Sequence, residues 1–575
     1  MIGFGTRVSR PRIAARWRAI RRAAKRVDAR VAVLLLACLP GACAYLEHVA
    51  IQSEYERLQH ADPRQIILKH MVERDTFFVV GQTNDTGTVY TGVPLAVAAY
   101  SSKFKPHELV DTMVPVVAGT HFGLNLPAGD FDLLVFADLN ADRVFDSAEV
   151  VGQARLSLNR TTVSDKILDR IGVELSSPRR IAWADPIAAP AQAGPRPSLF
   201  YPTGSIRSLD DPLFDSNMAT LGMYDPASFL ERAPTMFYAL EEDLPYKIPV
   251  VFVHGAGGSA RDFEPIVSRL DRNRYKPWFF YYPSGGDLDQ LAELFHRIFL
   301  SGTVIDLVEM PMVIVAHSMG GLIVREALNK VGGRAKETRV GLLVTIASPF
   351  GGHPSAALGE KHGMLVLPAW RDLNPDSRFI GRLFRKPLPD SVRYHLLYAY
   401  DNPSAVKLSK NSDGVVPLSS QLRPEAQREA ARQLGLESGH ADVLANESMI
   451  AHLFGNMGRV ENFFPESHLR VLRLGGYDVP LSEGYSPIMR YIVANLGRYW
   501  MAISKGVLEP IHPEQERFVR AVRGEEPPSR DVVREWIRFL GEHPGIDDDP
   551  RPGVRSDQAQ RDAFVCGVDC AAPRQ

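Results

Sequence analysis

Cysteine is scarce in this chain of 575 residues, which contains only four. They lie near the two ends, at Cys38, Cys43, Cys566 and Cys570. The long segment between Cys43 and Cys566 therefore holds no disulfide and no metal site built on cysteine. Cys566 and Cys570 are candidates for a local disulfide in an oxidising compartment, although their spacing does not require one.

The chain also lacks a net charge of either sign and a long apolar run. Its formal net charge is −1, so it has no overall attraction to nucleic acid, and we expect no nucleic-acid partner. The apolar run 31–43 is too short to span a bilayer, which takes about 20 residues. No internal repeat stands out. A chain of 575 residues exceeds what one hydrophobic core usually supports, so we expect two or more domains.

The charge balance hides a basic N-terminus. Residues 1–30 contain ten Arg or Lys and a single acid, Asp28, and the apolar run to Cys43 follows directly. A basic region, an apolar core and small residues are typical of an export signal, which we predict over 1–43. A cysteine after small residues resembles the lipobox of bacterial lipoproteins, with Cys43 or Cys38 as the lipidated residue. The expected location is the bacterial cell envelope, either periplasmic or membrane-anchored. The alternatives are a plain cleavable signal and a basic arm without a targeting role.

From residue 60 to 180 the sequence consists of short β-rich runs separated by Gly, Asn and Asp turns. Thr76–Val80, Leu95–Tyr100 and Phe131–Phe136 are such runs. Several short strands with turn signals between them favour a β-sandwich. We therefore predict an antiparallel, β-sandwich-like domain over 60–180.

Within this domain, residues 138–149 match the spacing of a calcium loop. Arg143 stands where such loops usually have glycine, and the flanking segments resemble strands rather than helices. Two interpretations stay open, a calcium site and an acidic hairpin turn. The candidate ligands, at the first, third, fifth, ninth and twelfth positions, are Asp138, Asn140, Asp142, Asp146 and Glu149.

The most informative segment is Ala316-His317-Ser318-Met319-Gly320. An apolar run, Met312–Val315, precedes it, and a segment with the pattern of a helix, Gly321–Lys330, follows it. A strand that turns sharply into a helix, with small residues two before and two after a serine, is typical of a nucleophile elbow. The sharp bend crowds the backbone, which explains the small residues. Ser318 is the predicted nucleophile.

A glycine-rich turn, His254–Gly258, follows the apolar strand Pro249–Val253. In hydrolases built on the elbow, an N–H group of such a turn and that of the residue after the nucleophile form the oxyanion hole. We predict Ala256 and Met319 as the two donors.

A serine hydroxyl needs a base, and the base needs an orienting acid. Hydrolases with this elbow place them downstream, in the order Ser, Asp or Glu, His. Asp413, in the tight turn Asn411–Pro417, is the predicted acid. His440, in a loop before the apolar-periodic stretch Val443–Leu453, is the predicted base.

Other residues compete for these roles. Asp401 and Asp442 are the alternatives for the acid, and His452 and His395 for the base. His452 and His395 lie inside a predicted helix and a predicted strand, where packing is the more common role. His254 and His317 flank the site, so we expect them to support it.

These motifs, taken in order, resemble the small secreted bacterial lipases of the α/β-hydrolase superfamily. The block Thr345–Gly352 is similar to the loop after strand six in lipases and in GPI-inositol-deacylase-like esterases, and blocks 280–285 and 372–379 are also similar. The resemblance covers about 247–462. It implies hydrolysis of carboxylic esters through an acyl-enzyme, with no metal or organic cofactor in catalysis.

The resemblance implies an α/β-hydrolase fold, a mostly parallel sheet flanked by helices, over 241–465. Residues 181–240 form a predicted linker, rich in proline up to Pro202, and an edge-packing segment. Residues 466–575 form a predicted helical extension. One of its helices starts at Ser486-Pro487 and runs to Ser504, and another spans Asp531–Leu540. The extension either covers the active site as a lid or docks elsewhere.

The substrate is the least defined part of the prediction. Tyr281, Tyr282 and Phe350 are candidates to line an acyl pocket, although aromatic residues at strand ends are as often core. The expected partners are a lipid or acyl ester and, through the lipid anchor, a membrane. Two alternative functions stay open: an acyltransferase or thioesterase with the same triad, and a non-catalytic surface lipoprotein that binds or scaffolds.

Overall fold

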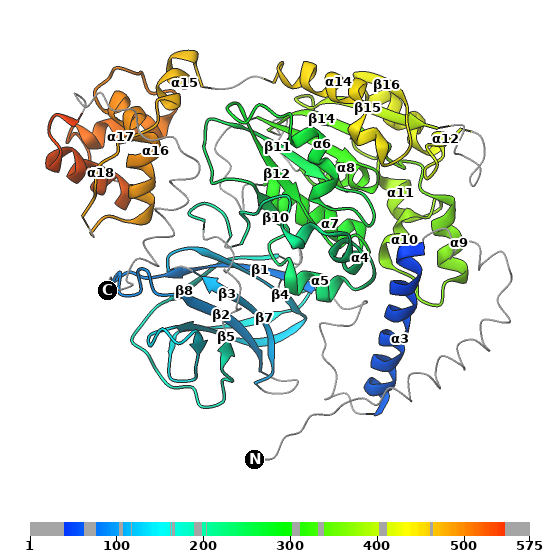
Figure 1. The fold of residues 1–575 in the computed structure, drawn as a ribbon, viewed down its shortest axis with the longest axis horizontal. Helices are drawn as coiled ribbons and strands as arrows, with labels where there is room; N and C mark the ends of the chain where they lie inside the picture. Colours follow the sequence, from blue (N-terminus) through cyan, green and yellow to red (C-terminus); the bar gives the residue numbers. More distant parts are fainter. Residues whose placement is uncertain are drawn as a thin grey trace, which may run out of the picture.

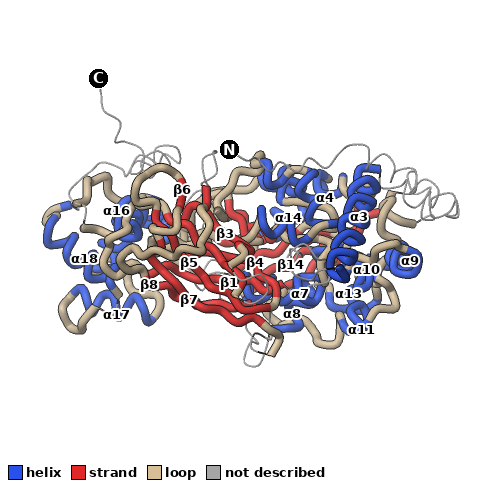
Figure 2. Tube along the Cα trace, turned by 90° about the horizontal axis from the view of Figure 1, so that it is seen from below, coloured by secondary structure: helices blue, strands red, loops and turns tan. Residues whose placement is uncertain are grey.

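The protein is described by a computed structural model over residues 39–61, 76–102, 107–116, 118–161, 163, 167–188, 198–202, 204–301, 311–331, 339–401, 411–460, 464–482, 484–528 and 530–546. Figure 1 shows a β domain below a larger α/β domain, with a group of C-terminal helices on one side. Seen from below, strands occupy the middle of the molecule and helices gather at both ends (Figure 2).

The β domain is a sandwich of two sheets that enclose a core of their own. One sheet has the order β4-β1-β8 and the other β3-β2-β5-β7. Phe77, Leu124 and Val135 are among the fully buried residues between them. The predicted sandwich is confirmed, but the β1–β8 pair is parallel, which corrects the expectation of purely antiparallel strands. The strands are β1 (Thr76–Asn84), β2 (Leu95–Ser101), β3 (Leu109–Val116), β4 (His121–Pro127), β5 (Gly129–Ala137), β7 (Val150–Leu158) and β8 (Ile167–Glu174).

The predicted calcium segment forms a tight loop between β5 and β7. It contains the short strand β6 (Val144–Phe145), which pairs with β9 (Ile187–Ala188). The carboxylates of Asp142 and Glu149 accept backbone N–H groups of the loop, for example that of Val144 at 2.7 Å and that of Leu139 at 3.0 Å. Within the described residues, no group of three or more His, Cys, Asp or Glu is arranged to hold a metal ion. The calcium site stays a prediction.

The α/β domain is built on a seven-stranded sheet with the order β10-β12-β11-β13-β14-β15-β16. All neighbours are parallel except β10 and β12. The central strands β11 and β13 are buried along their whole length, as expected for parallel strands covered on both faces. The strands are β10 (Phe237–Ala239), β11 (Ile248–Val253), β12 (Tyr275–Phe280), β13 (Met312–His317), β14 (Val340–Ile346), β15 (Arg393–Tyr400) and β16 (Arg432–Glu437).

Helices cover this sheet and fill its connections (Figure 1). Between β14 and β15 the chain inserts three short helices, α9, α10 and α11. Helix α3 packs against α4 and, through the ring contact of Tyr45 with Trp370, against α10. The hydroxyl of Tyr45 in α3 donates to the Leu365 carbonyl and accepts the Leu365 N–H, both at 2.8 Å. The helices are α3 (Leu39–Ala61), α4 (Ser216–Tyr224), α5 (Pro226–Arg232), α6 (Glu264–Val267), α7 (Leu288–Phe295), α8 (Met319–Lys330), α9 (Pro354–His362), α10 (Pro368–Leu373), α11 (Arg378–Arg382), α12 (Leu418–Gln421), α13 (Pro424–Glu429) and α14 (Glu447–Met457).

The β sandwich packs against the α/β domain through its three-stranded sheet. Phe78, Val80 and Ile167 from this sheet belong to the core of the α/β domain. The Gln290 side chain also donates to the Thr76 carbonyl at 3.0 Å. The two domains therefore share apolar contacts as well as hydrogen bonds.

The C-terminal helices are α15 (Glu466–Arg473), α16 (Pro487–Ser504), α17 (Pro513–Val522) and α18 (Asp531–Glu542). The predicted start of α16 is confirmed, because the Ser486 side chain accepts the Met489 N–H. Trp536 and Phe539 are fully buried in a core of these helices. The Tyr491 hydroxyl donates to the Asp243 carbonyl at 2.5 Å, beside the β10 edge of the sheet. Figure 1 shows the group on the side of the molecule away from α9, α10 and α12.

The predicted export signal lies largely outside the described residues, as do Cys38, Cys566 and Cys570. Helix α3 begins at Leu39 and so runs through Cys43, near the end of the predicted signal. Over the described part of the chain, no helix combines the length and the apolar character needed to cross a membrane.

Candidate active site

Ser318 stands at the sharp turn between β13 and α8. Its backbone has φ 51° and ψ −127°, a strained conformation for a residue with a side chain and one expected of a nucleophile elbow. The neighbouring glycine is required by space, because a Cβ atom on Gly320 would lie 2.5 Å from the Val253 carbonyl oxygen. Helix α8 starts at Met319, so the serine lies at its positive end.

The structure brings together the three residues predicted to form a triad. The Nε2 atom of His440 lies 2.9 Å from Ser318 Oγ, and its Nδ1 atom lies 2.6 Å from Asp413 Oδ2. Because an ionised carboxylate only accepts, Nδ1 carries the proton and Nε2 is free to accept the serine proton. The histidine side chain is 14% exposed and the aspartate side chain 0%, so solvent reaches part of the imidazole but not the carboxylate.

The loop around Asp413 holds its carboxylate from the other side. Its Oδ1 atom accepts the N–H groups of Val415 and Val416, at 2.9 and 2.6 Å. The N–H of His440 donates to the Asp413 carbonyl at 2.9 Å. This bond joins the loop around Asp413, residues 411–417 (the acid loop), to the loop around His440, residues 438–442 (the base loop). The carboxylate is therefore aimed at the imidazole by its own backbone.

The predicted oxyanion turn follows β11 and lies against the elbow. A Cβ atom on Gly255 would lie only 2.8 Å from the Cβ atom of Ser318, so the turn approaches Ser318 closely. The N–H of Met319 opens α8, where helix geometry leaves it without an intrahelical acceptor. The Ala256 N–H belongs to the turn, whose next residue, Gly257, donates its N–H to the Ser284 hydroxyl at 2.9 Å. The role of Ala256 and Met319 as oxyanion donors stays a prediction.

His254 supports this turn. Its Nδ1 lies 2.8 Å from the Gly255 carbonyl, and its Nε2 accepts the Tyr282 N–H at 3.3 Å. One ring nitrogen thus donates and the other accepts, which only the neutral imidazole can do. Burial accordingly lowers the pKa of His254 to about 4. The expectation that His254 supports the site agrees with these contacts.

The alternative residues for acid and base lie elsewhere. His395 and His452 face each other, with 3.1 Å between Nδ1 and Nε2, and His395 is fully buried. The imidazole of His440 bonds to Asp413 rather than to Asp401 or Asp442. The geometry therefore favours the main assignment for both roles.

The three aromatic residues predicted to line an acyl pocket are buried in the core. Tyr281 is 0% exposed, and Tyr282 and Phe350 are each 1% exposed. Tyr282 stacks on the His254 ring at 4.1 Å and donates its hydroxyl to the His254 carbonyl, so it serves the oxyanion turn. Phe350 packs against Phe384. These contacts are those of residues that pack in the core. The role of the three rings in an acyl pocket stays a prediction.

Sequence reasoning missed two supporting residues. Gln421 donates to the Asp413 carboxylate, and Ser284 accepts the Gly257 N–H. Neither stands at a spacing that a motif defines. Ser284 lies within block 280–285, which resembles lipases, but the resemblance assigned no role to this serine.

A family model described as lecithin:cholesterol acyltransferase matches residues 291–371, which include the elbow. Among solved structures, the mature lipase BlEst2 of Bacillus licheniformis is 19% identical over 38% of this chain and 97% of that chain, with a TM-score of 0.30. Lipase B of Aspergillus fumigatus is 16% identical over 38% of this chain and 54% of that chain, with a TM-score of 0.28. Phospholipase PlaB of Legionella pneumophila is 16% identical over 30% of this chain and 45% of that chain, with a TM-score of 0.26.

No curated protein matches this chain. Similarities this low do not assign an activity. The sheet order, with the elbow after β13 and the acid and base loops after β15 and β16, is that of the α/β-hydrolase fold.

Proposed function

We propose that this α/β-hydrolase is a serine hydrolase that cleaves carboxylic esters of lipids or other acyl groups through an acyl-enzyme. The observation that carries the proposal is the continuous chain of contacts from Ser318 Oγ to His440 and on to Asp413, at 2.9 and 2.6 Å. A serine is a weak nucleophile until a base of this kind accepts its proton.

In the proposed reaction, Ser318 Oγ attacks the ester carbonyl while His440 Nε2 takes its proton. Asp413 holds the imidazole and stabilises its charged form, and His440 then gives the proton to the leaving alcohol. The N–H groups of Ala256 and Met319 stabilise the negative oxygen, each worth about 2.7–4 kcal/mol in the transition state. Water releases the acyl group by the reverse path. No step uses a metal or an organic cofactor.

The lipid character of the substrate rests on the match to the family described as lecithin:cholesterol acyltransferase. That description also supports a second candidate, transfer of the acyl group to an acceptor other than water. A thioesterase with the same triad is a further variant. All three share the acyl-enzyme and differ in what attacks or leaves. A role as a non-catalytic scaffold would not require the serine, imidazole and carboxylate to stand in bonding order.

The test is hydrolysis of p-nitrophenyl esters from acetate to palmitate by the full chain. We expect turnover that increases with acyl length, and a loss of about 10⁴-fold or more in Ser318→Ala. The matched control is Ser268→Ala, an exposed serine whose hydroxyl contacts the Pro265 carbonyl. Added long-chain alcohol then separates the candidates, since an acyltransferase forms a new ester and a hydrolase releases only free acid. Equal turnover by wild type and Ser318→Ala would overturn the proposal.

We also propose that the protein is exported and held at the cell envelope. The support is the basic segment 1–30 followed by the apolar run to Cys43. Fractionation of cells that express the full chain should place it in the envelope, and Cys43→Ser or Cys38→Ser should release it from the membrane. Recovery of the wild-type chain in the cytoplasm would contradict export.

A further inference from the structure

Gln421, the last residue of α12, is fully buried behind the acid of the triad. Its side chain reaches the end of β15 and the acid loop at the same time. The Oε1 atom accepts the Ala399 N–H at 2.9 Å, and the Nε2 atom donates to the Ala399 carbonyl at 3.0 Å. It thus pairs with both backbone groups of one strand residue.

The same amide nitrogen faces the acid loop. Nε2 lies 3.1 Å from Asp413 Oδ2 and 3.1 Å from the Val416 carbonyl oxygen. Its two hydrogens are therefore shared among three acceptors, counting the Ala399 carbonyl. The reverse orientation of the amide would set its oxygen against two carbonyls and a carboxylate. The hydrogen-bond partners of the Gln421 amide therefore fit only one orientation of its oxygen and nitrogen atoms.

We infer that Gln421 is a positioning residue of the triad, which holds the Asp413 carboxylate in line with His440. The inference rests on the proposed function. Oδ2 is the oxygen that receives His440 Nδ1 at 2.6 Å, while Oδ1 is held by the N–H groups of Val415 and Val416. Among the described residues, Gln421 supplies the one side-chain donor to Oδ2 besides the imidazole, and its bonds to Ala399 fix that donor to the sheet.

The Gln421 donor also limits the basicity of Asp413. An N–H directed at Oδ2 stabilises the ionised carboxylate and competes with His440 for its charge. Removing the donor leaves Oδ2 more basic, which strengthens its attraction for the charged imidazolium. Loss of the donor should therefore move the acid limb of the pH–activity profile to higher pH.

The other titratable groups around the pair are His317, His353, Asp401 and Asp442. His317 contacts the His440 carbonyl, and His353 contacts the Val415 carbonyl. Asp401 and Asp442 lie near Gly439 of the base loop. None of the four is among the hydrogen-bond partners of Gln421 given above, so a substitution at Gln421 acts on the pH profile through Asp413.

The experiment compares Gln421→Met, which keeps the shape but removes the amide, with Gln427→Met as the control. The Gln427 side chain donates to the Leu422 carbonyl, and within the described part of the chain it has no hydrogen bond to Ser318, His440 or Asp413. The measurement is kcat/KM for a p-nitrophenyl ester against pH, per active site titrated with a fluorophosphonate, so that misfolded protein does not count. We expect Gln421→Met to lose about 10- to 100-fold in kcat/KM and its acid limb to move to higher pH. The control should keep the wild-type profile.

Gln421→Glu provides a second signature. When protonated, the new carboxyl can still donate to Asp413, but when ionised it repels it. We therefore expect activity near wild type at low pH and a loss as the pH rises through a range where wild type stays active.

Wild-type profiles in both Gln421 variants would overturn this role and leave the proposed function intact. Failure of the wild-type protein itself to react with the fluorophosphonate would overturn the proposed function and this role together.

Discussion

The Nε2 atom of His317 lies 2.9 Å from the carbonyl oxygen of His440. The residue before Ser318 thus contacts the backbone of His440, so the turn at Ser318 and the loop that carries His440 are fixed to each other. Burial, together with the nearby His440, lowers the pKa of His317 to about 3. The ring is therefore neutral in the physiological range, and its Nε2–H donates to the carbonyl.

Replacing His317 by Leu removes this donor and frees the His440 loop. We predict a fall of about 10- to 100-fold in kcat/KM, because small displacements of a catalytic group are costly. His452→Leu is the control, since His452 pairs with His395 and not with the triad. Equal kcat/KM in His317→Leu and wild type, measured with a p-nitrophenyl ester, would show that the contact does not position the base.

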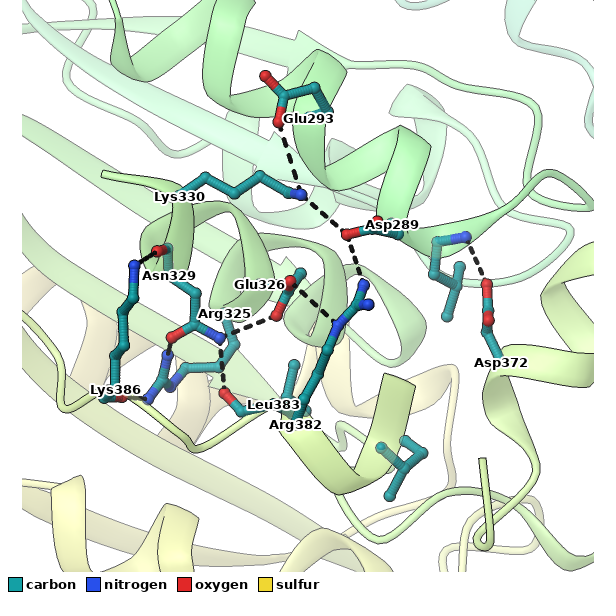
Figure 3. A network of polar contacts seen from close by, with 12 residues as sticks. Asp289, Glu293, Arg325, Glu326, Asn329, Lys330, Asp372, Arg382, Leu383 and Lys386 are labelled. Carbon is teal, nitrogen blue, oxygen red and sulfur yellow. Dashed lines mark hydrogen bonds and ion pairs between the residues drawn. The ribbon is translucent and has the colours of Figure 1, made fainter. Parts of the chain in front are cut away.

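Asp372 joins the inserted helices to the main domain (Figure 3). Its Oδ2 atom accepts the Leu288 N–H at 2.8 Å and so caps α7. It lines a polar pocket of about 390 Å³ with Asp287 and Asp289. Burial, and next the Asp287 carboxylate, raise the pKa of Asp372 to about 7. Nearby, Arg382 of α11 pairs with Asp289 at 2.6 Å.

A raised carboxyl pKa makes stability fall as the pH rises. Between the unfolded value, near 4, and about 7, the folded protein binds the extra proton, so stability is greatest below this window and is lost through it. Asp372→Asn should therefore raise the free energy of unfolding at pH 8 by roughly 1–3 kcal/mol and change little at pH 4. Denaturant unfolding at the two pH values tests this, with exposed Asp376→Asn as the control. A variant less stable than wild type at pH 8 would contradict it.

The predicted calcium site lies in the loop 138–149. Asp138 is 8% exposed, and its Oδ1 atom has no hydrogen-bond partner among the described residues. Ala141 and Arg143 adopt positive φ angles of 57° and 64°. A cation bound near Oδ1 would compensate the cost of this buried oxygen.

We predict that calcium raises the melting temperature of the full chain. Binding to the folded state adds about 2.7 kcal/mol when the free ion is 100 times above its dissociation constant. Glu149→Gln, which removes a charged ligand at the twelfth position, should abolish the shift. Identical melting of the wild type in calcium and in chelator would exclude the site.

Several local backbone features could be predicted from the sequence, because each depends on steric rules that act over a few residues. In the candidate site these are the sharp turn at Ser318 and the glycine at Gly255, and in the C-terminal helices the cap at Ser486. The strands β11 and β13 were visible as continuous apolar runs. The order of nucleophile, acid and base then selected Asp413 and His440 among several candidates.

The supporting residues could not be predicted in this way. Gln421 contacts Asp413 because α12 folds back under β15, and no local pattern encodes that packing. The aromatic residues show a second limit of local patterns, which left both the pocket and the core interpretation open. Tyr281 and Tyr282 follow a strand end, as pocket residues do, yet the rings pack inward, and only the three-dimensional structure shows which way they face.

The most direct test of the account is covalent labelling with a fluorophosphonate, followed by mass spectrometry. The wild-type chain should gain one adduct, on the peptide that contains Ser318, and Ser318→Ala should gain none. His440→Ala should label far more slowly, since its serine has no base. An adduct of equal yield in wild type and Ser318→Ala, or on another residue, would contradict the assignment of Ser318 as nucleophile.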